Sequence, residues 1–579
     1  MVDITINNIQ ASVPEGTTIL EAAKELGINI PTLCHLDLHD IKMVNKVGTC
    51  RVCMVEVEGR YNLMPACSAE VHRGMVIHTN THRAIQARRT VVDLFLSNHP
   101  TDCLVCERNM SCELQSLTAE LGIRENRYSG PRLRAEKDTS SYSIVRNVEK
   151  CVLCRRCETM CNDLQTVGVY SAVHRGFETV IGTAFDRNMI DTACTFCGQC
   201  VNVCPTGALT EIDDTAKVWD AIADTEKVVI VQTAPAVRVA LGEAFGMDSG
   251  TRVTGKMVAA LRKMGFDKVL DTDFAADLTI MEEASELIHR IQHGEPLPLL
   301  TSCCPAWVKF IEHQFPALLD VPSSCKSPQE MFGALAKTYL AQKLGIDPSK
   351  MVMVSVMPCL AKKFEARREE LAGKETGDVD FVISTRELAR MIREAGINFT
   401  MLTDEDFDDF MGESTGASVI FGTSGGVIEA AIRTAAAWLD KDNPSPKIDF
   451  KELRGIEGLR EAEVEIAGKK LSIAIANGLG SARKLLTDIR DGKAQYHAIE
   501  IMACPLGCVG GGGQPYHGNN TEVLKKRADA LYAEDGCKEL RRSHENPQIK
   551  KLYEEFLGEP YGDKAHELLH TKYQERDYL

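Results

Sequence analysis

The sequence lacks the features that mark several common classes of protein. Its 579 residues carry a formal net charge of −16, which argues against a nucleic-acid partner. No run of eighteen apolar residues is present, so no membrane-spanning helix is expected. The N-terminal segment shows no basic region followed by an apolar one, so we expect no secretory signal and a cytoplasmic location. A chain of this length predicts several domains.

Cysteine, by contrast, is unusually frequent. The chain has 22 cysteines, and in a reducing compartment thiols are more often metal ligands or catalysts than disulfide partners. Most of them stand two or three residues apart, whereas the second half of the chain contains long cysteine-free runs. The pattern predicts four modules, at residues 1–80, 81–125, 140–215 and 216–579.

The first module combines a strand pattern, VDITIN, with a capped helix, TTILEAAKELG, that is closed by Gly27. One isolated cysteine, a close pair and a distant fourth resemble the plant-type arrangement for a two-iron cluster, although the first gap is longer. A zinc site is the alternative, but zinc motifs usually present two close pairs. The predicted ligands are Cys34, Cys50, Cys53 and Cys67.

The second module is expected to be short and helical and contains NHPTDCLVCERNMSC. A lone histidine is usually an ordinary polar side chain, but here it precedes three cysteines on a predicted helix and completes a four-ligand set. Zinc also accepts three thiolates and one imidazole. The position between two iron–sulfur modules favours a [4Fe-4S] cluster. The predicted ligands are His99, Cys103, Cys106 and Cys112.

The third module carries CVLCRRCETMC and CTFCGQCVNVCP, two copies of the bacterial ferredoxin run. In this run three cysteines bind one [4Fe-4S] cluster and the fourth binds the other. One predicted ligand set is Cys151, Cys154, Cys157 and Cys204, and the other is Cys194, Cys197, Cys200 and Cys161.

The fourth module alternates short apolar strands with helices. The expected pairs are VVIVQ with PAVRVALGEAFG, DFVIS with RELARMIREAG, and SVIFG with GGVIEAAIRTAAAWL. This alternation predicts an α/β domain with largely parallel sheets, whose chemistry lies at the carboxyl ends of the strands.

Three cysteine motifs follow predicted strands of this module: TSCCPAW, MPCLAKKFE and MACPLGCVGGGGQP. A ligand set gathered from three separate loops suits a buried active-site cluster better than a simple relay. The run GGGGQP lacks the Gly-Lys-Ser/Thr ending of a phosphate loop, so we expect its glycines to let the backbone approach a cluster. The predicted ligands of this further cubane are Cys304, Cys359, Cys504 and Cys508.

These assignments use nineteen of the 22 cysteines and leave Cys303, Cys325 and Cys537. Cys325 and Cys537 are expected to be structural or surface thiols. Cys303 stands beside a predicted ligand, where a thiol is an acid able to pass protons to a metal-bound species. A buried, unreactive thiol is the alternative for Cys303.

The three motifs resemble the signature stretches of [FeFe]-hydrogenases, and the resemblance covers nearly the whole chain. The segment SHENPQIKKLYEEFLGEPYGDKAHELLHTKY is similar to the small subunit of that family, here fused. The resemblance implies a multidomain α+β and α/β protein: a β-grasp [2Fe-2S] domain, a helical His/Cys₃ module, a 2[4Fe-4S] ferredoxin-like domain and a large α/β catalytic domain. It also implies an H-cluster, in which Cys508 joins the [4Fe-4S] cubane to a two-iron unit with carbonyl, cyanide and dithiolate ligands.

The resemblance further assigns roles to single residues. Cys303 shuttles protons to the two-iron unit, and Lys362 donates to a cyanide ligand. On the residues alone, MEEASELIHR favours a solvated helix face and Lys362 a surface lysine. Ala236 departs from the serine of some relatives, so a polar contact near the cofactor is expected to be missing. The implied proton path contains Glu283, Glu286, Ser323 and Arg290, and the implied pocket residues are Pro235, Gln329, Met357, Phe421 and Met502.

The implied function is the reversible conversion of protons and electrons to H₂, with electrons relayed by the N-terminal clusters. The N-terminal modules also resemble iron–sulfur subunits of respiratory complex I, so a non-catalytic electron-transfer or H₂-sensing subunit is the alternative. MACPLGC and the complete set of relay residues argue against that alternative, and against a relative in iron–sulfur assembly.

The sequence also bears on the protein that exchanges electrons with this chain. No Gly-x-Gly-x-x-Gly fingerprint follows a strand, so coupling to NAD(P) is expected on another polypeptide. The expected partners are a flavin- and NAD(P)-binding subunit, a small iron–sulfur subunit and ferredoxin, with electron bifurcation between them. A stand-alone ferredoxin-dependent hydrogenase has the same modules and stays open.

Overall fold

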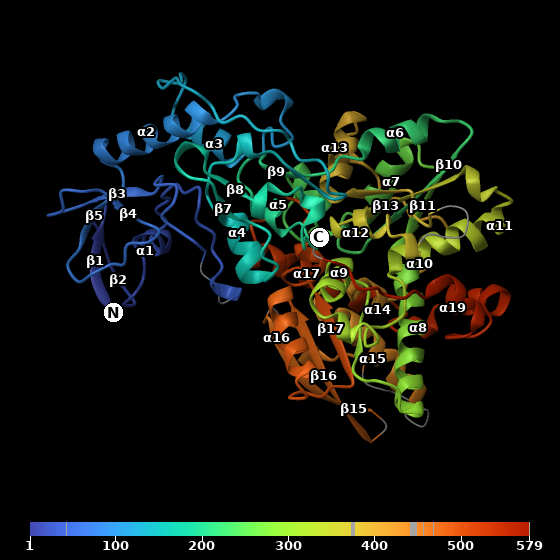
Figure 1. Ribbon diagram of the computed structural model, residues 1–579. Coiled ribbons are helices and arrows are strands. Elements are labelled where there is room, and N and C mark those ends of the chain that lie inside the picture. Colours follow the sequence, from blue (N-terminus) through green and yellow to red (C-terminus); the bar gives the residue numbers. More distant parts are fainter. Residues whose placement is uncertain are drawn as a thin grey trace. The chain divides into compact units, whose positions relative to one another are not determined.

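The chain forms two units by its internal packing (Figure 1). The computed structural model describes residues 1–41, 43, 45–371, 377–439, 448–455, 457–466 and 468–577. Unit 1 comprises Met1–Asp163, Gly168–Ile190 and Val203–Thr210, and unit 2 comprises Leu164–Val167, Asp191–Asn202 and Glu211–Leu579. No helix of the described residues is long and apolar enough to cross a membrane.

Unit 1 begins with a small mixed sheet and one helix. The strand order is β2-β1-β5-β3-β4, and β1 pairs in parallel with β5. Helix α1 begins with a capping box, in which Thr18 accepts from the Glu21 N–H and Glu21 accepts from the Thr18 N–H. The predicted strand and capped helix are therefore present. The elements are β1 (Val2–Ile6), β2 (Ile9–Val13), α1 (Ile19–Glu25), β3 (Met54–Val57), β4 (Met64–Pro65) and β5 (Val76–His78).

The rest of unit 1 is mostly helical turns and short ribbons. As predicted for the second module, two helices dominate it, α2 (His82–Asn98) and α3 (Glu113–Glu120). The ferredoxin-like segment contributes α4 (Arg156–Thr159), β6 (Ile144–Arg146), β7 (Ser171–Val173), β8 (Val180–Gly182) and β9 (Leu209–Glu211).

Unit 2 contains two four-stranded sheets. The first has the order β11-β10-β13-β14 and is entirely parallel. The second has the order β12-β17-β16-β15, in which only the edge strand β15 is antiparallel. Largely parallel sheets were expected and are confirmed. The strands are β10 (Val228–Thr233), β11 (Lys268–Asp271), β12 (Leu299–Leu300), β13 (Met351–Met357), β14 (Phe381–Ser384), β15 (Leu459–Ile466), β16 (Lys469–Asn477) and β17 (Ala498–Met502).

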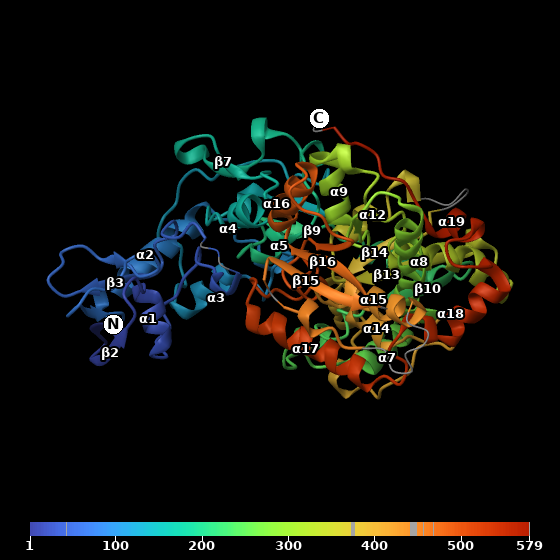
Figure 2. The same ribbon diagram turned by 90° about the horizontal axis from the view of Figure 1, so that it is seen from below.

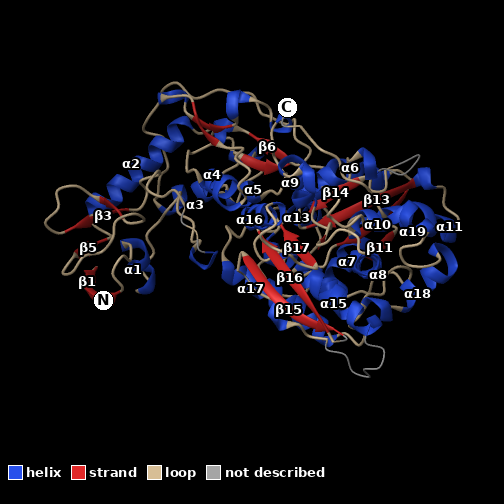
Figure 3. Ribbon diagram, turned by 60° about the horizontal axis from the view of Figure 1, so that its bottom comes forward, coloured by secondary structure: helices blue, strands red, loops and turns tan. Residues whose placement is uncertain are grey.

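Helices surround these strands (Figures 2 and 3), and α19 lies against α10 (Figure 1). Strand β13 is buried along its whole length, in keeping with a sequence that is apolar except for Ser355. The helices that bear on the site are α8 (Thr272–His293), α9 (Pro305–Gln314), α10 (Pro328–Leu335), α12 (Ala361–Glu365), α13 (Thr385–Glu394), α14 (Gly416–Val419), α15 (Gly426–Leu439), α17 (Thr521–Cys537) and α19 (Asp563–Leu569).

Three expectations for unit 2 are wrong. PAVRVALGEAFG forms turns and the 3₁₀ segment Leu241–Phe245, because the Arg238 carbonyl accepts from the distant Val253 N–H. SVIFG is not a strand but the end of α14 and a 3₁₀ turn, since a short apolar run does not distinguish a strand from a buried helix. MEEASELIHR is not a solvated face, because most of α8 is buried.

A buried carboxylate ties the second sheet to α15. Glu500 of β17 accepts from the Gly425 N–H at 2.5 Å and from the Ile428 N–H at 3.0 Å, at the start of that helix. This contact fixes the end of β17, from which the loop with Cys504 and Cys508 departs.

We expect Glu500→Gln to lower the free energy of unfolding by about 1 to 3 kcal/mol, because a buried amide N–H loses its acceptor. Glu463→Gln on β15 is the matched control, since that carboxylate is exposed, and should change stability by less than about 0.5 kcal/mol. Thermal unfolding followed by circular dichroism, at equal iron content, measures both. Equal midpoints for the two variants would contradict the role of Glu500.

Candidate active site

One cavity of unit 2 collects the segments that follow its strands. Its empty volume is about 740 Å³. Its walls come from the carboxyl ends of β10, β12, β13 and β17, where ligands bind in parallel sheets. The predicted pocket residues Pro235, Gln329, Met357, Phe421 and Met502 all line it, as does Ala236.

Four thiols face this cavity from three loops. Cys304 precedes α9, Cys359 follows β13, and Cys504 and Cys508 follow β17. All four are free thiols. Burial raises the pKa of Cys359 to about 12 and also raises that of Cys304, so thiolates here require a nearby cation. The donor set therefore fits a metal cluster, which stabilises deprotonated sulfur.

Glycines bring the loops together at close range. A Cβ at Gly511 would lie 2.2 Å from the carbonyl oxygen of Pro358, and one at Gly512 would lie 2.6 Å from the Cα of Gly198. These glycines thus allow the last cysteine loop to pack against the backbone beside Cys359 and Cys197. In the structure, the glycines let this loop approach the backbone of other segments, whereas the expectation was a close approach to a cluster.

Cys303 lines the same cavity and lies next to the predicted proton path. Glu283 accepts from the Ser302 N–H at 3.3 Å, while its Oε2 is buried without a partner among the described residues. Burial raises the pKa of Glu283 to about 8. Burial, together with the charge of Glu283, raises the pKa of Cys303 well above its usual value. Both groups therefore hold their protons at neutral pH.

The outer part of the path is a hydrogen-bonded group on α8. Glu286 accepts from Ser323 Oγ at 2.8 Å and from Arg290 Nη2 at 2.5 Å. Arg290 also donates to the carbonyl oxygen of Val321. Within the described residues no hydrogen bond joins Glu283 to Ser323 directly. The structure therefore brings Glu286, Ser323 and Arg290 into contact and places Glu283 with Cys303.

Lys362 is buried and also lines the cavity, so it is not a surface lysine. Its Nζ donates to Glu365 Oε2 at 2.7 Å and to the Cys303 carbonyl at 3.2 Å. Glu365 additionally accepts from Ser327 and Gln329. Glu365 was missed by the sequence reasoning, although the i,i+3 spacing within MPCLAKKFE is a signal for this ion pair.

The four cysteines predicted to hold a two-iron cluster in unit 1 are buried and lie together. The thiol of Cys34 lies within hydrogen-bonding reach of those of Cys50 and Cys67, and Cys67 also contacts Cys53. Four converging thiols from two loops fit a small cluster.

The first ferredoxin set also converges. Cys151, Cys154, Cys157 and Cys204 line one cavity of about 440 Å³. The second set is divided: Cys161 belongs to unit 1, while Cys194, Cys197 and Cys200 belong to unit 2. That second set stays a prediction.

For the histidine module the structure brings three of four residues together. His99 follows α2 and shares a cavity with Cys103 and Cys112. Its Nδ1 is buried without a partner among the described residues, and burial lowers its pKa to about 4. A neutral imidazole with a free nitrogen is the form that binds metals. Cys106 lies outside this cavity, close to Gly207 and Lys150.

Family models match most of the chain. The iron-only hydrogenase large subunit, C-terminal domain, matches residues 227–512, and the iron hydrogenase small subunit matches 521–576. The matches before them are a 2Fe-2S iron-sulfur cluster binding domain at 1–82, the NADH-ubiquinone oxidoreductase-G iron-sulfur binding region at 88–127 and a 4Fe-4S dicluster domain at 134–208. The expected multidomain fold class is confirmed.

Whole proteins agree with these models. The chain is 56% identical to the NADP-reducing hydrogenase subunit HndD of Solidesulfovibrio fructosivorans, over 100% of both chains. It is 40% identical to iron hydrogenase 1 of Clostridium pasteurianum, over 99% of this chain and 100% of that one. A solved structure of the [FeFe]-hydrogenase HydA1 from Chlamydomonas reinhardtii matches with a TM-score of 0.57 and 44% identity, covering 63% of this chain and 99% of the other. The chain therefore belongs to the [FeFe]-hydrogenase family.

Proposed function

We propose that this iron hydrogenase interconverts protons, electrons and H₂ in the cavity of unit 2, as the catalytic subunit of an NADP-linked complex. The observation that carries the proposal is the convergence of four thiols, Cys303 and Lys362 on one cavity at the strand ends. A non-catalytic relay protein needs neither a titratable thiol nor a buried ammonium beside its cluster ligands.

The chain's own residues would hold the H-cluster, with Cys304, Cys359, Cys504 and Cys508 as ligands and Cys508 as the bridging thiolate. When bound, this group supplies the redox centre at which the H–H bond forms and breaks. Lys362 presents a buried ammonium, fixed by Glu365, to an anionic ligand of the centre. The cavity is lined by Pro235, Met357, Phe421 and Met502, whose apolar side chains limit the access of water.

Protons would reach the cavity through Arg290, Glu286, Ser323 and Glu283 and pass to the thiol of Cys303. Glu286 accepts hydrogen bonds from the Ser323 hydroxyl and the Arg290 guanidinium, and the pKa of Glu283, raised by burial to about 8, lets that residue carry a proton at neutral pH. Because Glu283 and Ser323 are not directly bonded, this step needs a water or a side-chain rotation.

Electrons would pass through one [2Fe-2S] cluster and three [4Fe-4S] clusters, one of them held by His99 and three cysteines. The orphaned Nδ1 of His99 supports its role as a ligand. Since Cys106 points elsewhere, cluster binding would require it to turn toward His99.

The relative at 56% identity is named as a subunit of an NADP-reducing hydrogenase. We infer a flavin- and NADP-binding partner subunit and a small iron–sulfur subunit for this chain, with ferredoxin as a further electron partner. The cytoplasmic location expected from the sequence is part of the same proposal. Co-purification of a flavoprotein and H₂-dependent NADP⁺ reduction by the resulting complex test it; a purified protein that turns over H₂ with no flavoprotein bound and no NADP⁺ reduction would contradict it.

Cys303→Ala should abolish most turnover while the cofactor still assembles, because all nineteen predicted cysteine ligands remain. A positioned acid–base group contributes about 10² to 10⁴-fold, so we expect at least that loss. Cys303→Ser should remain slow because a hydroxyl is a far weaker acid than a thiol of pKa about 8.5, whereas Cys303→Asp should keep more activity. H₂ evolution with a chemical reductant measures the rate, and infrared bands of bound carbonyl and cyanide report assembly. Wild-type turnover by Cys303→Ala would contradict the role.

His99→Ala should disturb one accessory cluster and leave the catalytic centre assembled. We expect about four fewer irons per chain, or altered electron paramagnetic resonance of one [4Fe-4S] centre. His82→Ala at the other end of α2 is the matched control and should keep full iron content. Unchanged iron and unchanged spectra in His99→Ala would restore the structural interpretation of this histidine.

The complete set of clusters implies about 20 irons per chain in matured protein. Iron quantification with infrared spectroscopy measures the inventory and the two-iron unit together. A preparation that turns over H₂ without carbonyl and cyanide bands would contradict the assignment of the active site.

A further inference from the structure

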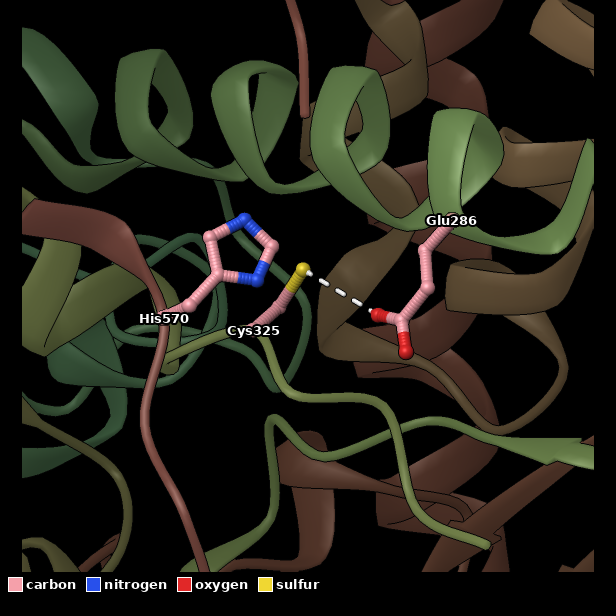
Figure 4. A group of neighbouring side chains, drawn as sticks. All are labelled: Glu286, Cys325 and His570. Carbon is pink, nitrogen blue, oxygen red and sulfur yellow. Dashed lines mark hydrogen bonds between the residues drawn. The ribbon is translucent and has the colours of Figure 1, made fainter. Parts of the chain in front are cut away.

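A second group of potential metal ligands lies beside the proposed proton path. Glu286, Cys325 and His570 are all buried, and one ligand atom from each lies within 4.8 Å of the other two (Figure 4). They come from α8, from the segment before α10 and from the segment after α19. Cys325 was expected to be a structural or surface thiol, and its contact with Glu286 at 3.8 Å places it in a polar setting.

The orientation of His570 is set by a carboxylate on its far side. Its Nε2 lies 3.0 Å from Glu282 Oε2, and Glu282 also accepts from the Tyr561 N–H and the Tyr553 hydroxyl. Because Glu282 offers only acceptors, Nε2 carries a hydrogen, and Nδ1 is the ring nitrogen on the side of Cys325. Nδ1 lies 2.7 Å from Ser324 Oγ and faces the sulfur of Cys325 (Figure 4).

A carboxylate that holds the outer nitrogen of a histidine is the usual support of a protein metal site. It fixes the tautomer and turns the free nitrogen toward the ion. Thiolate, imidazole and carboxylate are together the ligands that Zn²⁺ prefers, with water completing a tetrahedral site. Arg290 already pairs with Glu286, so the thiolate, Glu286 and Glu282 together balance the charges of a divalent cation and of this guanidinium.

We propose that Glu286, Cys325 and His570 form a binding site for Zn²⁺, with Glu282 as the residue that orients His570. Binding forms the Zn–S bond to Cys325, whose thiol proton is released to solvent, and involves no redox change. The hydrogen bond between Ser324 and His570 is exchanged for a metal–nitrogen bond to the neutral imidazole.

Main-chain pairing holds these ligands in place before any metal arrives. Cys325 and His570 form an antiparallel bridge, the Thr571 N–H donates to the Ser324 carbonyl at 2.7 Å, and the Lys326 N–H donates to the Leu569 carbonyl at 2.8 Å. Metal binding therefore requires the three side chains to move closer together, whereas the backbone stays in place. Bound Zn²⁺ would fasten the C-terminal segment to α8.

The site has a consequence for turnover that rests on the proposed function. Glu286 is the group that links Arg290 to Ser323 in the proposed proton path. A metal-bound carboxylate is no longer free to accept a proton. Zn²⁺ should therefore inhibit H₂ turnover without touching the redox centre.

The matured enzyme, incubated anaerobically with ZnCl₂ and desalted, tests the site. Zinc content and the zinc K-edge absorption spectrum are compared between wild type, Cys325→Ser and His570→Gln at equal iron content. Cys537→Ser, which removes an exposed non-ligand thiol, and His566→Asn, whose exposed ring lies 4.1 Å from that of His570, are the matched controls. If His570→Gln does not fold, the comparison of wild type with Cys325→Ser is sufficient for the test.

We expect wild type and both controls to retain one more zinc per chain than Cys325→Ser, bound by one sulfur. We also expect the zinc concentration for half-inhibition to rise at least tenfold in Cys325→Ser, measured against its own zinc-free rate. Equal zinc retention in wild type and Cys325→Ser would overturn the site. Cys325-dependent zinc binding without inhibition would support the site and contradict the place of Glu286 in proton transfer.

Discussion

Parallel strand pairing is the constraint on which the catalytic cavity depends. β10 pairs with β13, and β12 pairs with β17, each in one direction, so the loops after these strands leave from the same edges. Cys304, Cys359 and Cys504 stand on three of those loops. A slip of one residue in either register would turn every side chain to the opposite face, and the thiols would no longer share one cavity.

Buried charge on α8 is the second determinant of the site. Burying a carboxylate is costly unless partners satisfy it, and this helix buries several. The partners come from distant segments, and the C-terminal segment supplies many of them. Asn546 donates to Asp277, while Tyr553, Tyr561 and His570 contact Glu282. The segment that matches the small subunit of the family thus supplies hydrogen-bond partners to the buried carboxylates of α8.

Glu286 belongs both to the proposed proton path and to the proposed zinc site. Glu286 is a buried carboxylate that accepts hydrogen bonds from a hydroxyl and from a guanidinium group. That environment also suits a cation that displaces protons. The proposed proton path and the proposed zinc site thus both use Glu286, so the two proposed roles exclude each other at any moment.

The sequence by itself determined the ligand spacing and most regular elements. The short spacing of Cys151, Cys154 and Cys157 keeps these thiols near one cavity, because three residues span roughly 10 Å at most. The capped helix at Thr18 and the buried strand β13 likewise follow from local pattern. The motif resemblance, rather than periodicity, supplied the path residues on α8.

Tertiary structure decided what local pattern does not encode. The helix α8 has a polar sequence that favours exposure, yet distant partners bury it. SVIFG is buried and helical. A short apolar run satisfies burial equally well as a helix or as a strand, so its sequence alone does not select between them. Cys325 has an unremarkable local context and meets Glu286 and His570 only through folding. The burial and pairing of a polar group depend on residues far away in the chain, so no short window of sequence contains them.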